Sequence, residues 1–109
     1  MNARILIGGL LLLVGAIGAG AAPGAALPTP QITIEHFQFQ PSALTVPVGT
    51  TVTWVNHDAD THTVTSPTGA FGSPALETDE KFSFTFNAPG IYAYFCALHP
   101  HMKSTVVVK

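Results

Sequence analysis

Hydrophobic and polar residues alternate with a period of two along most of the chain after residue 30. The alternation is clearest over 82–86, where three phenylalanines are separated by hydroxyl residues, while 50–55 and 105–108 are rich in β-branched residues. Because successive side chains of a strand point to opposite faces of a sheet, this period predicts strands and no long helix. Turn-forming Pro, Gly and Asn separate the segments. The sequence therefore predicts an all-β sandwich of seven to eight short strands, largely antiparallel.

The alternation breaks in two places. The apolar positions run through Ile34 and resume at Phe37, so the phase shifts by one near His36, which predicts a β-bulge. Between Ser66 and Asp79 the residues are largely Pro, Gly, Ser and Thr, without periodicity. We expect this segment to be the longest irregular connection in the domain.

The start of the chain has a different composition. Arg4 precedes an apolar, Gly- and Ala-rich stretch over 5–22, which is the pattern of an export signal. We predict a signal peptide and short spacer over 1–26, or an uncleaved membrane anchor, followed by one domain over 27–109. The predicted location is exported, in the periplasm or another extracytoplasmic space.

Composition narrows the possible functions. The 109 residues are 47% hydrophobic and 9% charged, with a net charge of −2 and a single Cys. Such a chain is too short for a multi-domain enzyme and cannot form an intrachain disulfide. It also lacks the basic patch that binding to a nucleic-acid backbone requires. A small, mildly acidic β domain remains, and its function depends on a few side chains.

The most informative of these side chains follow one predicted strand. Cys96, His99 and Met102 are spaced by three residues, so a tight loop could bring a thiolate, an imidazole and a thioether to one point. Copper prefers this set of ligands. His62 begins another extended segment after a polar loop and is the best candidate for a fourth ligand; His57 is the main rival. A lone thiol in an oxidising compartment would also be protected by a metal.

Other uses of the same residues are less favoured. A buried structural cysteine is the commonest role of a single Cys, but it does not account for the spacing of His99 and Met102. A thiol enzyme would need a group that orients the base, and none is evident. Zinc is disfavoured because thioether is a poor zinc ligand.

Taken in order along the chain, the motifs resemble the cupredoxin family of type 1 blue copper proteins, and within it the amicyanin- and plastocyanin-like members. The resemblance covers Gln31 to Lys109. It is carried by Phe39-x-Pro41-x-x-Leu44-x-Val46-x-x-Gly49-Thr50-x-Val52-x-Trp54-x-Asn56, by His62-Thr63-Val64, and by Phe84-x-Phe86-x-x-Pro89-Gly90-x-Tyr92-x-Tyr94-x-Cys96-x-x-His99-x-x-Met102.

The resemblance implies a cupredoxin-like Greek-key β-sandwich with one type 1 copper held by His62, Cys96, His99 and Met102. It implies a monomeric electron carrier, not an enzyme, which shuttles electrons between larger redox proteins. A periplasmic copper carrier or chaperone that transfers the ion itself is the alternative. Many relatives have Asn after the first ligand His, where it ties the two ligand loops together; here we expect the hydroxyl of Thr63 to do so.

Overall fold

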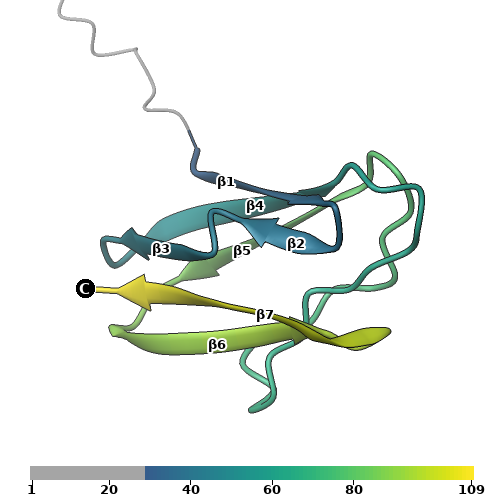
Figure 1. Ribbon diagram of the computed structural model, residues 1–109. Helices are drawn as coiled ribbons and strands as arrows, with labels where there is room; N and C mark the ends of the chain where they lie inside the picture. The colour runs from purple at the N-terminus through teal and green to yellow at the C-terminus, as the bar shows by residue number, and fades with distance from the viewer. Residues whose placement is uncertain (1–28) are drawn as a thin grey trace, which may run out of the picture.

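The computed structural model describes residues 29–109, which form seven strands in two layers (Figure 1). Within this described part no helix is long and apolar enough to cross a membrane. The strands are β1 (Gln31–Glu35), β2 (Gln38–Gln40), β3 (Ala43–Val46), β4 (Thr50–Asn56), β5 (Lys81–Phe86), β6 (Gly90–Cys96) and β7 (His99–Val108).

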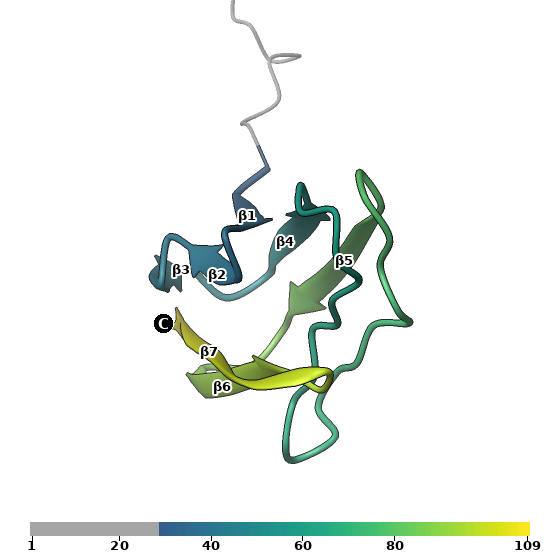
Figure 2. The same ribbon diagram turned by 45° about the vertical axis from the view of Figure 1, so that its right-hand side comes forward.

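The two layers differ in strand order. One sheet has the order β2-β1-β4-β5 and the other the order β3-β7-β6. β1 with β4 and β3 with β7 are parallel pairs, whereas the remaining pairs are antiparallel. Figure 2 shows the sheets facing each other across the core; β3 is drawn beside β2 but pairs with β7 of the second sheet. The prediction of an all-β sandwich of seven to eight strands is confirmed.

Aromatic side chains fill the space between the sheets. Trp54 is fully buried on β4. The centroid of its ring lies 5.5 Å from the ring centroid of Tyr94 on β6 and 6.4 Å from that of Phe86 on β5. Each large ring removes much apolar area from water, which a domain of this size needs for stability. The alternating residues of the strands thus form one core.

The predicted bulge near His36 is wrong, because the chain reverses there. β1 and β2 form an antiparallel hairpin in which Ile34 pairs with Phe39, and His36 and Phe37 make the two-residue turn. Both turn residues have positive φ, 55° and 57°. Turns of this kind match the twist of paired strands and usually contain Asn-Gly. Since that signal is missing, the change of phase resembled a bulge.

The long irregular connection is present as predicted. No named strand occurs between Asn56 and Lys81; the segment is joined to the fold by isolated bridges such as that of His62 with Leu76. In both views it lies at the end of the sandwich where β6 turns into β7 (Figures 1 and 2). The predicted signal peptide over 1–26 lies outside the described residues.

Candidate metal centre

Three side chains with metal-binding atoms meet at this end of the sandwich. The donor atoms of His62, Cys96 and His99 all lie within 4.8 Å of one another. Cys96 Sγ is 3.6 Å from Nδ1 of His62 and 3.7 Å from Nδ1 of His99. Both imidazole rings therefore point their Nδ1 atom toward the sulfur. The rival His57 is exposed and instead lies 3.4 Å from Asp79, so it is not part of this cluster.

A tight hairpin positions two of the three donor side chains, those of Cys96 and His99. Cys96 ends β6 and His99 begins β7, so only Ala97 and Leu98 separate the strands, and the ladder register shifts between Phe95 and Cys96. A local irregularity of this kind re-aims side chains beside functional sites. The final strand thus begins at His99, whereas the Val-rich segment over 105–108 predicted a later start.

The structure places Met102 within β7 and not in a loop. Its side chain is 3% exposed and belongs to the hydrophobic core. Because side chains three apart on a strand point to opposite faces of a regular sheet, the spacing alone would separate Met102 from His99. The register of the β6–β7 pair shifts beside the turn, so the side chains at the start of β7 need not alternate regularly between the two faces.

His62 comes from the irregular connection and is completely buried. Its backbone exchanges two hydrogen bonds with Leu76, at 3.1 and 2.8 Å. Its ring is fixed from the other side by Asp58, whose Oδ2 lies 2.8 Å from Nε2. An ionised carboxylate only accepts hydrogen bonds, so Nε2 donates to Asp58 and Nδ1 is the ring nitrogen that faces the cluster.

Asp58 also accepts hydrogen bonds from the backbone N–H groups of His36 and Phe37, at 2.8 and 2.9 Å. Burial raises the pKa of the Asp58 carboxyl, but the bonds from these two N–H groups and from His62 outweigh burial and lower the pKa below its ordinary value. The carboxyl is therefore ionised at neutral pH. The sequence analysis did not identify this role of Asp58; its position four residues before His62 was the only signal.

Buried Asn56 holds the backbone of the connection. Its Nδ2 donates to the carbonyls of Asp60 and Leu76, both at 2.9 Å, and its Oδ1 accepts from the N–H of Asp58, also at 2.9 Å. One side chain thus fixes both arms of the segment that contains His62.

Thr63 joins the connection to the hairpin. Its Oγ1 accepts a hydrogen bond from Ala97 N at 2.8 Å, and its own N–H donates to Cys96 Sγ at 3.3 Å. The expectation that the Thr63 hydroxyl ties the two ligand segments together is confirmed. A donor to the sulfur also stabilises thiolate charge, which a metal site with a Cys ligand requires.

The cluster is shielded except on one side. His62 and Cys96 are 0% exposed, whereas His99 is partly exposed beside Leu98, which is 54% exposed. Phe37 packs edge-on against both imidazoles, with ring centroids 5.1 Å from His62 and 4.9 Å from His99. His99 is therefore the part of the cluster that reaches the surface.

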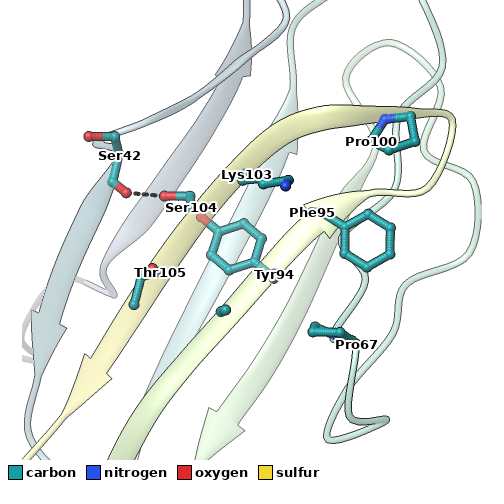
Figure 3. A pocket seen from close by; sticks show the side chains of 9 residues that line it. Ser42, Pro67, Tyr94, Phe95, Pro100, Lys103, Ser104 and Thr105 are labelled. Carbon is teal, nitrogen blue, oxygen red and sulfur yellow. Dashed lines mark hydrogen bonds between the residues drawn. The ribbon is translucent and has the colours of Figure 1, made fainter.

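A separate hollow lies on the β6–β7 sheet (Figure 3). It has a volume of about 760 Å³ and is lined by Phe95, Pro100, Lys103 and neighbouring residues. At its edge the hydroxyl of Ser104 donates a hydrogen bond to the carbonyl of Ser42. None of the three clustered donors lines it. The hollow therefore offers no substrate site at the cluster.

The chemistry of the donor set determines which metal ion it would hold. One thiolate and two imidazoles with a single open side suit a copper ion that accepts sulfur and nitrogen ligands, and the thioether of Met102 would complete the set. Structural zinc sites contain four N, S or O ligands and rarely thioether. The residues present fit copper.

Similarity to known proteins agrees with the geometry. Residues 7–108 match the family model described as a cupredoxin-like domain. The chain is 36% identical to amicyanin-alpha from Methylorubrum extorquens, over 72% of this chain and 71% of that protein. It is 35% identical to amicyanin from Paracoccus denitrificans, over 72% of this chain and 63% of that protein.

Solved structures show the same relationship. The Cu(I) form of a mutant amicyanin superposes with a TM-score of 0.73 at 32% identity, over 78% of this chain and 86% of that chain. A copper-containing nitrite reductase from Thermus scotoductus gives a TM-score of 0.71 at 32% identity, but the match spans only 23% of that chain. The similar domain thus also occurs inside a larger enzyme. Together with the donor set, these similarities identify copper as the cofactor.

Proposed function

The chain belongs to the cupredoxin family, and on that premise we propose that it is a type 1 blue copper protein that carries electrons between larger redox proteins. When bound, copper supplies a one-electron Cu(II)/Cu(I) couple. We propose that His62, Cys96 and His99 would hold the ion most strongly and that the thioether of Met102 would be its weakest ligand.

One observation carries this proposal: a thiolate and two imidazoles converge in a buried cluster that opens to the surface only at His99. His62 and Cys96 are enclosed, so small molecules have no path to them, whereas an electron can pass through the His99 ring edge. Leu98 and Phe37, both exposed beside it, would provide an apolar contact for a partner protein.

The polypeptide supports rapid transfer by holding its donors in one arrangement. The β6–β7 ladder fixes Cys96 and His99, while Asp58 and Thr63 fix His62 and the sulfur. Donors that move little between oxidation states keep the reorganisation cost of transfer small. Two imidazoles lie close enough to the Cys96 sulfur to accept a proton from it, but the sulfur is completely buried and could not reach a substrate. We therefore propose a carrier and no enzymatic activity.

We further propose that residues 27–109 form the exported domain and act as a monomer in an extracytoplasmic compartment. The export-signal pattern over 5–22 and the similarity to amicyanins support this location.

The visible spectrum of protein loaded with Cu(II) tests the proposal. We expect an intense blue colour from the copper–thiolate bond, lost in Cys96→Ser, together with reversible cycling at an electrode. Colourless protein that does not cycle would overturn the assignment. Rapid transfer of the ion to a metal-free acceptor, faster than electron exchange, would instead favour the copper-carrier alternative.

A further inference from the structure

The turn between β1 and β2 has a conformation that its own residues disfavour. His36 and Phe37 both lie in the left-handed region, where the Cβ atom crowds the backbone. His enters this region more often than most residues, but a bulky residue such as Phe37 rarely does, and the turn has no Gly. Contacts outside the turn must therefore hold it, since such conformations persist only where surrounding structure imposes them.

Asp58 makes those contacts. Its Oδ1 accepts from His36 N, and its Oδ2 accepts from both Phe37 N and His62 Nε2. Its side chain is only 10% exposed, so water cannot readily replace these partners. One carboxylate thus joins the β1–β2 turn to a proposed copper ligand from a different part of the chain.

The turn places the Phe37 ring over both imidazoles. The ring meets that of His62 at an interplanar angle of 88° and that of His99 at 84°. Phe37 and Met102 also line a surface hollow of about 470 Å³. If Phe37 moved away, both imidazoles would lose their apolar cover and solvent would approach the cluster.

We propose that Asp58 is a positioning residue that seats Phe37 as a cover over the two imidazoles and thereby retains the bound ion. This inference rests on the proposed function, because it takes His62 and His99 as ligands. It goes further by assigning a role to a turn that contains no ligand.

Three N–H groups donate hydrogen bonds to Asp58, and accepting all three requires a carboxylate. Asn has nearly the same shape as Asp, but only one of its two terminal atoms accepts hydrogen bonds. In Asp58→Asn, at least one N–H group of the turn or the imidazole must face an NH₂ group. The turn then loses a contact that holds its positive φ angles, and Phe37 is released.

The first experiment measures the rate at which a chelator removes copper from the loaded protein. We expect Asp58→Asn to accelerate loss by about 10- to 100-fold, the range usual for removing a partner of a metal-ligating His. Asp60→Asn is the matched control, since it removes the same charge from an exposed side chain in the same loop, and we expect it to leave the rate unchanged. Equal rates for the two variants would overturn the proposal.

The second experiment separates the cover from the direct bond to His62. Asp58→Asn is repeated in a Phe37→Ala background. If Asp58 acts through Phe37, its substitution accelerates copper loss much less once the ring is absent. Fully additive effects would show that Asp58 acts on His62 alone and would refute the role of Phe37.

A third measurement uses metal-free protein and so does not depend on the proposed function. We expect the backbone amides of His36 and Phe37 to exchange hydrogen faster in Asp58→Asn than in wild type or Asp60→Asn. Unchanged exchange would contradict the inference even if the protein is blue. A wild-type protein that fails to bind copper, with the amide effect present, would contradict only the proposed function.

Discussion

Two regions bring donors to the same point by different means. The β6–β7 hairpin presents Cys96 and His99 through a regular backbone ladder and a two-residue turn. The connection over 57–80 presents His62 with isolated bridges and scattered backbone hydrogen bonds, and the side chains of Asn56 and Asp58 supply further bonds that hold it. The first region is specified by backbone pairing, which most residues can make. The second depends on particular polar residues, each of which has few substitutes.

This difference has a mechanical consequence. A ladder distributes its hydrogen bonds over many residues, so losing one side chain leaves it intact. In the connection, a single amide or carboxylate satisfies several buried backbone groups, and its removal leaves them without partners. Polar substitutions should therefore damage the connection, while the hairpin should be sensitive to its apolar packing.

The largest effect is expected for Asn56→Ala. The substitution removes three hydrogen bonds within the connection and leaves buried partners unsatisfied. We expect metal-free protein to lose about 3 kcal/mol of unfolding free energy in denaturant titrations. Asn87→Ala, at an exposed turn, is the control and should change stability by less than about 0.5 kcal/mol. A loss below about 1 kcal/mol for Asn56→Ala would argue against the dependence on this side chain.

Val106→Ala tests the hairpin through its packing. Val106 lies on β7 and is fully buried between the sheets. Removing two methyl groups should cost about 2 kcal/mol from lost burial and the cavity left behind. The same titration measures it, and exposed Val48→Ala serves as the comparison. Similar small losses in both variants would mean that packing does not stabilise the hairpin as we infer.

Thr63→Val examines the link between the two regions. Valine has the shape of threonine but cannot accept the hydrogen bond from Ala97 N. We expect a stability loss of about 1 kcal/mol and faster loss of copper, because the ligand segments are less firmly joined. Thr63→Ser keeps the hydroxyl and should retain most of both properties. If valine and serine behave alike, the hydroxyl does not join the regions.

The smallest effect is expected for a side-chain contact on a ladder. Thr85 Oγ1 lies 2.6 Å from Thr51 Oγ1 across β4 and β5, on the exposed face. Thr85→Ala should cost about 0.5 kcal/mol, the usual size of a cross-strand pair, and leave the rate of copper loss unchanged. A cost as large as that of Asn56→Ala would remove the distinction between ladder and connection.

Much of the architecture could be predicted from local patterns. The alternation over 82–86 placed β5, and the Cys96-x-x-His99-x-x-Met102 spacing pointed to copper before any geometry was known. Both succeed because strand periodicity and ligand chemistry are properties of the residues themselves. The turn at His36 was missed because its conformation is imposed by Asp58, 22 residues away.

The sequence by itself determined that this is a β protein with sulfur and imidazole donors, since two-residue alternation and residue chemistry need no partner to be recognised. Only the tertiary structure decided which nitrogen of His62 faces the sulfur, what covers the imidazoles, and how Asn56 and Asp58 hold the connection. The physical reason is that hydrogen bonds and ring contacts join atoms from distant segments, and their meeting depends on the path of the folded backbone.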